Sequence, residues 1–500
     1  GFIKLSFDSF FFTEYRVMKD KIIINILLFI VFVFVPYQTN AQQTLNKYLD
    51  EYLSNYIKTK QVPSISAGLL VNNEIKWVNS IGYSDIENNV AVSDKSLFRI
   101  ASISKPITAI AIMQLWEKGI LNLDIDIRKY IPYFPEKKYK FTIRQLLNHP
   151  AGIRNYKKGE FDSKKLYLTT KDALKVFEYD SLMFEPGTKY LYTSLGYNIL
   201  AAIIEEVTKK PFDNYVTETV LKTSGMSITR ADKQREIIPF RARGYEKNVD
   251  YNFINAPLAD LSIKVAGGGF LSNSKDLLLF AKALLENKLV DENTLRVMTK
   301  RTRLKNGTYI DYGLGFSLDV ENDTLKYFGH AGAGTGFSGS MIISPSKKIA
   351  AVYLTNIRDI NLGEPAKDIL SFYSTGIQPV ITQTISQELM KIYKTGGIDS
   401  TISKLSFIYK YQKELFNFDE DGLTVFSKNL LELNKSSDAI IYLKELVKLF
   451  PKSFKVMSIL GDAYLIDKNE GMALRYYRNA SQLNNSDKRI NDLIKKLSKK

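Results

Sequence analysis

Ser102 and Lys105 stand three residues apart at the start of the apolar run "SISKPITAIAIMQL". Residues three apart lie on one face of a helix, so the two side chains would meet. A serine hydroxyl becomes a useful nucleophile when a neighbouring base takes its proton. A lysine can be that base only if burial or a nearby cation lowers its pKa. The alternative is a helix-capping serine followed by a solvated lysine.

Two further segments carry groups that such a serine would need. Tyr192-Thr193-Ser194 lies between a Pro-Gly turn and an apolar-periodic helix. A phenol beside an ammonium group would have its ionised form favoured, so Tyr192 could deprotonate Ser102 and later protonate a leaving group. The alternative is a core tyrosine, because the chain has 30 tyrosines.

The second segment is "FGHAGAGTGFSGSM", in which glycines recur after a predicted strand. Glycine lets a backbone approach a ligand closely. The alternative is an ordinary glycine-rich hairpin.

In this order, Ser102-x-x-Lys105, Tyr192-x-Ser194 and His330-x-Gly332 resemble the SxxK, YxN and KTG or HxG motifs of class C β-lactamases and their penicillin-binding and esterase relatives. The flanking segments "LLNHPAGI", "FEPGTKYLYTSLGYNIL" and "GHAGAGTGF" are similar to that family as well. The similarity covers roughly residues 45–360.

The resemblance implies a role for each matched residue. Ser102 would be the acylated nucleophile, Lys105 its activating partner, and Tyr192 the general base and acid. The backbone amides of Ser102 and Ala333 would form the oxyanion hole.

Three residues would contact substrate. Gly332 would let the strand edge meet it, Ser194 replaces the family's asparagine, and His330 replaces the KTG lysine. A serine offers fewer hydrogen bonds than an amide, and a histidine is mostly neutral near pH 7. Both changes favour an esterase, amidase or D-amino-acid peptidase over an efficient β-lactamase.

The only other histidine, His149, is predicted to be structural, in a turn. Neither histidine is spaced with carboxylates as metal ligands are. We therefore expect no metal and no cofactor.

The elements that must position these groups follow from residue periodicity. Strand patterns near residues 64–85 and 312–355 flank a helix-rich middle, with a hairpin at Asn72-Asn73. This predicts an α+β architecture, an antiparallel sheet with a helical subdomain. The resemblance implies a β-lactamase/transpeptidase fold over residues 42–375.

Residues 381–500 lack strand patterns and repeat with a period of thirty-four. Leu460-Gly461, Tyr464, Ala473, Tyr477 and Ala480 follow the order of a tetratricopeptide (TPR) repeat, and residues 426–451 hold a second unit. We predict an all-α TPR-like region that binds a protein partner. An unrelated pair of helical hairpins is the alternative.

Residues 18–41 read as a signal peptide: a charged start at Met18-Lys19, a short apolar run, and Ala41 before the expected cleavage point. Residues 1–17 then read as translated upstream sequence. This predicts a secreted or periplasmic protein, anchored in a membrane only if the segment stays uncleaved.

The composition limits the number of folded units, the possible chemistry and the possible partners. The chain has 500 residues, enough for two folded units, and no cysteine, which excludes disulfides and thiolate nucleophiles. The charge of +16 is spread along the chain without a basic block, so no nucleic-acid partner is expected.

Taken together, the sequence predicts an exported serine hydrolase that cleaves a small ester, amide or peptide through an acyl-enzyme on Ser102. The alternative is a penicillin-binding, sensor or scaffold protein that does not turn over, in which the TPR-like tail carries the interaction.

Overall fold

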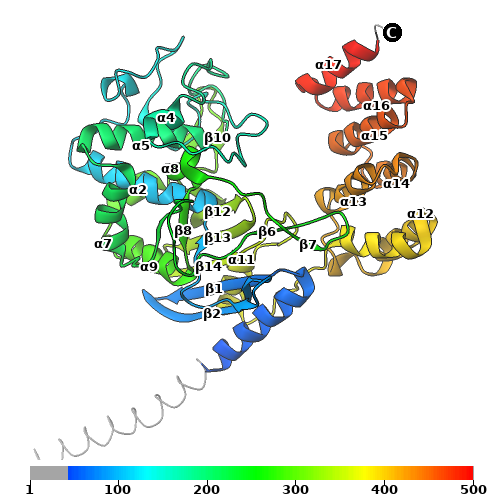
Figure 1. Ribbon diagram of the computed structural model, residues 1–500, viewed down its shortest axis with the longest axis horizontal. Coiled ribbons are helices and arrows are strands. Elements are labelled where there is room, and N and C mark those ends of the chain that lie inside the picture. The colour runs from blue at the N-terminus through cyan, green and yellow to red at the C-terminus, as the bar shows by residue number, and fades with distance from the viewer. Residues whose placement is uncertain (1–42, 499–500) are drawn as a thin grey trace, which may run out of the picture. The chain divides into compact units, whose positions relative to one another are not determined.

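A seven-stranded antiparallel sheet forms the centre of the computed structural model, which describes residues 43–498 (Figure 1). The strand order is β11-β12-β13-β14-β1-β2-β3. The strands are β1 (Ser64–Val71), β2 (Glu74–Asp85), β3 (Val90–Ala91), β11 (Ser317–Glu321), β12 (Thr324–Gly334), β13 (Phe337–Ser344) and β14 (Ile349–Thr355). The expected antiparallel sheet, built from the two ends of residues 64–355, is confirmed.

The hairpin between β1 and β2 turns at the two predicted asparagines. Asn72 and Asn73 have φ angles of 49° and 62°. Two successive positive φ values belong to the hairpin turn that matches strand twist, and asparagine tolerates them better than most residues.

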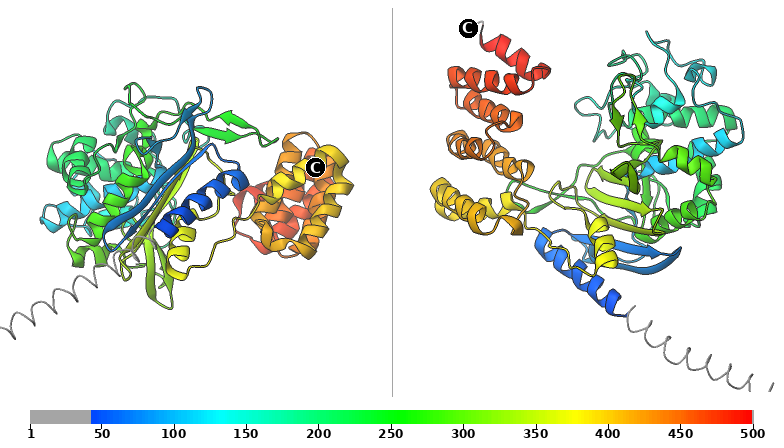
Figure 2. Two further views of the ribbon diagram at one scale, coloured as in Figure 1. Left: turned by 90° about the horizontal axis from the view of Figure 1, so that it is seen from below. Right: turned by 180° about the vertical axis from the view of Figure 1, so that it is seen from behind.

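Helices cover both faces of this sheet. Every residue of β14 is buried, as expected for a strand packed on both sides. α9 (Ser274–Leu285) lies on one face and α11 (Pro365–Thr375) on the other (Figure 2). α9 approaches closely because β1 has a glycine at Gly68, where a Cβ would lie 2.6 Å from Leu278 Cδ1.

The predicted helical subdomain stands beside the sheet. Its central helix, α2 (Ser104–Glu117), is buried on nearly all sides, which explains its almost continuously apolar sequence. The remaining helices are α3 (Ile143–Leu147), α4 (Thr170–Leu174), α5 (Leu195–Thr208), α6 (Phe212–Val216), α7 (Lys222–Ser224), α8 (Val265–Gly268) and α10 (Glu292–Met298).

Short strands brace the start of α2. A three-stranded sheet runs in the order β4 (Phe98–Arg99), β8 (Phe270–Ser272) and β5 (Arg230–Ala231), and the Ile100 amide donates to the Phe270 carbonyl over 3.0 Å. Two further pairs join β6 (Tyr245–Lys247) to β7 (Phe253–Asn255), and β9 (Thr302–Arg303) to β10 (Tyr309–Ile310).

Residues beyond 384 are helical and have their own apolar cluster. The helices are α12 (Ile385–Tyr411), α13 (Glu420–Glu432), α14 (Ser436–Leu449), α15 (Phe454–Ile466), α16 (Glu470–Leu483) and α17 (Lys488–Leu497). Within α12 the backbone turns at Gly397, where φ is 68°.

The thirty-four-residue spacing coincides with burial in this region. Phe426, Ala439 and Leu443 have no exposed surface, and neither do their counterparts Leu460, Ala473 and Tyr477. The predicted helical pairs are therefore present; their assignment as TPR repeats stays a prediction.

The predicted segments 1–17 and 18–41 lie outside the described residues. In residues 43–498 no helix combines the length and apolar character needed to traverse a lipid bilayer.

Gly461→Ala should loosen the pair α15 and α16. A Cβ at Gly461 would lie 2.5 Å from Tyr477 Cε1, and crowding of a packed core costs about 1–3 kcal/mol. Hydrogen exchange of the α15 and α16 amides should accelerate accordingly. Gly471→Ala is the matched control, because its nearest neighbour would be 4.0 Å away; equal protection in both variants would contradict the packing argument.

Candidate active site

Ser102 lies in a short 3-10 turn, Ala101–Ile103, directly before α2, which begins at Ser104 rather than at Ser102. Ala101 has a φ of 45°, a conformation that non-glycine residues rarely adopt. The turn leaves Ser102 half-buried between two buried neighbours. Its hydroxyl makes no capping bond to the helix, so the helix-cap alternative is wrong.

Lys105 is fully buried, so the solvated alternative is wrong as well. Its Nζ donates to Ser102 Oγ at 3.1 Å, to Ser194 Oγ at 2.9 Å and to the Gly267 carbonyl at 2.7 Å. Burial lowers its pKa well below the usual range, and the nearby ammonium of Lys264 lowers it further. Both conditions for a basic lysine are thus met.

Tyr192 lies close to both Ser102 and Lys105. Its ring centroid is 4.7 Å from Lys105 Nζ, and its hydroxyl is hydrogen-bonded to Ser102. Burial raises the pKa of Tyr192, and the bond to Ser102 opposes this only in part. The expected stabilisation of its phenolate is therefore wrong, because burial disfavours the charged form of the phenol.

His149 holds the backbone on both sides of Tyr192. The Leu191 amide donates to the His149 carbonyl, and the Thr193 amide donates to His149 Nδ1, each over 3.3 Å. The imidazole ring lies 4.4 Å from the Tyr192 ring, centroid to centroid. Burial and the nearby Lys105 lower the pKa of His149, which keeps Nδ1 free to accept this bond. The predicted structural histidine thus positions Tyr192.

Two glycines allow the elements that carry them to approach neighbouring residues of the site closely. A Cβ on Gly267 would lie 2.8 Å from the Ser194 carbonyl oxygen, and one on Gly332 would lie 2.2 Å from the Ile100 carbonyl oxygen. Gly267 belongs to α8 and Gly332 to β12, so these contacts bring both elements against the residues around Ser102.

The end of β12 offers a free backbone edge. β11 pairs with β12 only as far as Gly329, whereas β13 pairs with it through Gly334. Beyond Gly329, burial alternates, with Ala333 exposed between buried Gly332 and Gly334. The Ala333 amide is thus on a strand that passes next to the Ser102 turn.

His330 is brought near Tyr192, with 6.0 Å between ring centroids, but its nitrogens are engaged elsewhere. Nδ1 lies 2.5 Å from the Ala331 carbonyl and Nε2 lies 2.9 Å from Tyr312 Oη. Since a carbonyl only accepts, Nδ1 carries the hydrogen and Nε2 accepts from the tyrosine. Burial and Lys105 lower the pKa of His330 to about 3, so it presents no cation to a substrate.

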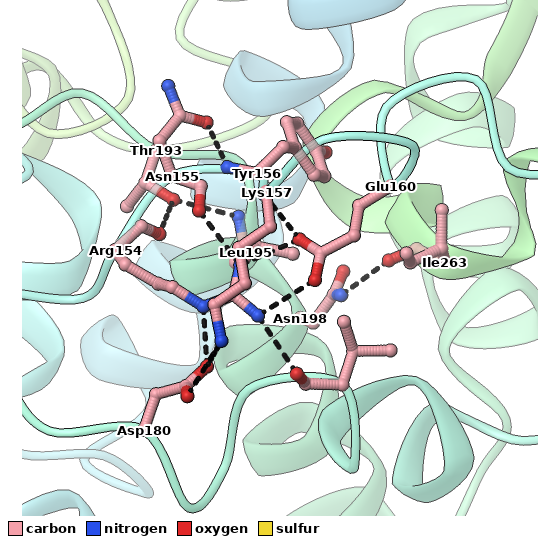
Figure 3. A network of polar contacts seen from close by, with 11 residues as sticks. Arg154, Asn155, Tyr156, Lys157, Glu160, Asp180, Thr193, Leu195, Asn198 and Ile263 are labelled. Atoms are coloured by element: carbon pink, nitrogen blue, oxygen red, sulfur yellow. Dashed lines mark hydrogen bonds and ion pairs between the residues drawn. The ribbon is translucent and has the colours of Figure 1, made fainter.

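A polar network supports the segment that carries Tyr192 (Figure 3). Arg154 is 8% exposed and forms ion pairs with Asp180 at 2.5 Å and Glu160 at 2.7 Å. Its carbonyl accepts a 2.7 Å hydrogen bond from the Thr193 hydroxyl. The loop after α3 is thereby tied to the residue that follows Tyr192.

Three residues that support the site were not identified from the sequence. Tyr312, Lys264 and Arg154 act through contacts between segments that are far apart in the chain. Lys264 offers the one local hint, a lysine in the apolar stretch "LSIKVAGGGF". Within residues 43–498, no group of side chains able to hold a metal ion lies together.

The sheet, the helical subdomain and the Ser102–Lys105 contact together place the chain in the class of β-lactamase/transpeptidase-like serine hydrolases. The chain belongs to the beta-lactamase family, whose sequence model matches residues 49–370.

Among curated proteins, the human mitochondrial serine beta-lactamase-like protein LACTB is 32% identical over 292 residues, covering 45% of this chain and 53% of that protein. Penicillin-binding protein 4* of Bacillus subtilis is 30% identical over 299 residues, covering 57% of this chain and 66% of that protein. The chain thus spans about half the length of the LACTB proteins it matches.

Solved structures share the fold at lower identity. The octameric penicillin-binding protein homologue of Pyrococcus abyssi is 22% identical with a TM-score of 0.58, covering 69% of this chain and 80% of its own. The D-amino acid amidase of Ochrobactrum anthropi is 22% identical with a TM-score of 0.59, covering 67% and 99%.

Exchanging Lys105 for methionine should flatten the pH dependence of stability. A lysine whose pKa is lowered in the folded state binds fewer protons there than when unfolded, so stability rises with pH between the lowered pKa and about 10.4. In that window Lys105 contributes a slope of up to about 1.4 kcal/mol per pH unit. Urea unfolding at a series of pH values should show the slope reduced in Lys105→Met. The exposed Lys275→Met is the control; identical slopes in both would refute a depressed Lys105.

Proposed function

We propose that this protein is an exported serine hydrolase that cleaves an ester or amide through an acyl-enzyme on Ser102. The observation that carries the proposal is the fully buried Lys105 amine in hydrogen-bonding contact with the Ser102 hydroxyl. A capped helix or a packed core needs no lysine in this position, since an unused buried amine only costs stability.

Lys105 is proposed to be the base for acylation. As a neutral amine it keeps the two hydrogen bonds that it donates to Ser194 and the Gly267 carbonyl, and its 3.1 Å contact with Ser102 reverses, so that the hydroxyl donates to the amine's lone pair. The Ser102 oxygen attacks the substrate carbonyl while its proton moves to Lys105 Nζ. Ser194 and Gly267 keep the amine oriented.

Tyr192 is proposed to act as the acid. Its raised pKa keeps the hydroxyl protonated, so it can deliver a proton to the leaving group as the tetrahedral intermediate collapses. The proton on Lys105 then restores the phenol. In deacylation the same groups act on water in the reverse order.

The negative oxygen of the intermediate needs donors fixed before the reaction. We assign this role to the backbone amides of Ser102 and Ala333, because Gly332 seats the free edge of β12 against the Ser102 turn. Gly332 is the residue that permits this approach.

The proposed substrates are small esters, amides or peptides. Relatives of this fold include penicillin-binding proteins and a D-amino acid amidase. Ser194 and neutral His330 supply no charge for a substrate carboxylate, which favours ester or amide cleavage over efficient β-lactam hydrolysis.

Export and partner binding complete the proposal. Residues 18–41 would direct the protein to the periplasm or outside the cell, and the helical pairs beyond residue 384 would bind a protein partner. The second candidate is a protein that acylates without turnover, leaving the helical region as the working part.

Ser102→Ala should abolish hydrolysis of p-nitrophenyl acetate, and Tyr192→Phe should reduce kcat by at least about 10²-fold, the usual loss of a general acid. A fluorophosphonate probe should label the parent protein and Tyr192→Phe, but not Ser102→Ala. Labelling without ester turnover would establish the second candidate, and full activity of Ser102→Ala would refute both.

The pH profile of kcat/KM should reveal the Lys105 amine. Activity requires the neutral form of this amine, so kcat/KM should rise with pH through the lowered pKa of Lys105. Lys264 is a cation below its own pKa of about 8, itself lowered mainly by burial. Lys264→Met removes that charge, raises the pKa of Lys105 and should move the acid limb to higher pH. Lys264→Arg keeps the charge and should leave the limb nearly in place; coincident limbs in all three proteins would contradict the coupling.

A further inference from the structure

Tyr312 is a buried tyrosine that is held at both ends. Its carbonyl accepts two hydrogen bonds from Thr302, one from the backbone amide at 3.0 Å and one from the hydroxyl at 2.5 Å. At the far end of the side chain, the Tyr312 hydroxyl donates to His330 Nε2 over 2.9 Å. Tyr312 is only 3% exposed. Its ring therefore has little freedom to move.

The Tyr312 ring packs against Tyr192 and against both histidines of the site. Its centroid lies 6.1 Å from that of Tyr192 with the ring planes at 76°, an edge-to-face contact. The centroids of His149 and His330 lie 4.8 Å and 5.7 Å from it. The same two histidines lie 4.4 Å and 6.0 Å from the Tyr192 ring. Tyr312 thus completes two triangles of packed rings, each with Tyr192 at one corner.

His330 connects this ring cluster to the central sheet. It belongs to β12, where it is aligned with Met341 of β13, and its Nδ1 lies 2.5 Å from the Ala331 carbonyl. Ala333, which we assign to the oxyanion hole, follows three residues later on the same strand. One strand therefore carries the proposed oxyanion donor and, through His330, fixes the ring that packs on the proposed acid.

We propose that Tyr312 is a positioning residue for Tyr192: tied to β12 through His330, its ring keeps the Tyr192 hydroxyl directed at the leaving group. The step it serves is the transfer of the Tyr192 proton to the leaving oxygen or nitrogen, as the bond from that atom to the carbonyl carbon breaks. The inference rests on the proposed function and deepens it, because it makes proton delivery depend on a residue that does not touch the substrate.

A role in packing alone explains Tyr312 less well. Phenylalanine would supply the same ring without a polar group to bury, and burying a hydroxyl is costly unless it is hydrogen-bonded. A satisfied hydrogen bond between two buried side chains selects one arrangement among those that packing would allow. The hydroxyl and its bond to His330 are therefore the features that need a reason.

The test compares two esters that differ only in the leaving group, p-nitrophenyl acetate and phenyl acetate. The quantity measured is the ratio of kcat/KM for the first ester to that for the second, since kcat/KM reports acylation, in which the leaving group departs. Phenolate is the more basic leaving group, so phenyl acetate depends more on the acid. A general loss of folded protein lowers both values equally and leaves the ratio unchanged.

Tyr312→Phe keeps the ring and removes the hydroxyl that fixes it. The ratio should rise by about tenfold, less than the ~10²-fold loss that a 1 Å misplacement can cause. Tyr56→Phe is the matched control, because Tyr56 is 1% exposed and its hydroxyl donates to the Leu362 carbonyl at 2.8 Å rather than to a residue of the site. This variant should keep the parent ratio.

Two further variants show whether the effect passes through the proposed route. Tyr192→Phe should raise the ratio by itself, and adding Tyr312→Phe should then change it little, because the effect of Tyr312 acts on Tyr192. His330→Ala removes the other partner of the same hydrogen bond. It should raise the ratio as Tyr312→Phe does, and it provides the decision if Tyr312→Phe folds poorly.

An unchanged ratio in a folded Tyr312→Phe or His330→Ala protein would overturn the proposal. So would a full further rise when Tyr312→Phe is added to Tyr192→Phe, because Tyr312 would then act by another route. If Tyr192→Phe alone left the ratio unchanged, or if the parent protein hydrolysed neither ester, the proposed function would be refuted and this inference with it.

Discussion

The buried amine of Lys105 is the interaction on which the site depends. Three hydrogen bonds fix it between the serine turn, Ser194 and the Gly267 carbonyl, so one side chain connects α2, the start of α5 and α8. Taking an amine out of water is costly, and the cost is reduced when the amine is uncharged. The same burial that weakens the fold therefore prepares a base, a trade of stability for activity that is common at functional sites.

Close backbone contacts are the second requirement. Strand β12 approaches the Ser102 turn closely because Gly332 lacks a side chain, and helix α8 approaches Ser194 closely because Gly267 lacks one. His149 and Arg154 then fix the segment around Tyr192 from behind. The precision of the site thus comes from rigid elements and their supports rather than from the three reactive side chains alone.

Local patterns in the sequence were sufficient for much of this. The paired asparagines gave the hairpin, alternation gave the strands, and the Ser-x-x-Lys spacing gave the contact between Ser102 and Lys105. The prediction that the ionised form of Tyr192 is favoured was wrong. The burial of Tyr192 raises its pKa, and this burial depends on packing between segments that are distant in the chain. The partner of His330 and the cation that acts on Lys105 were equally hidden, because Tyr312 and Lys264 approach these residues only after folding.

The pairing of β1 with β14 has a consequence for synthesis. β1 can pair with β2 as soon as both are synthesised, but its second neighbour is β14, in which Thr355 is aligned with Ile65. This second partner is synthesised only when most of the chain has left the ribosome. Contacts between such distant residues form late and slowly, because a long loop must close before any bond rewards it. The complete seven-stranded sheet, and the reactive site beside it, should therefore assemble only late in translation.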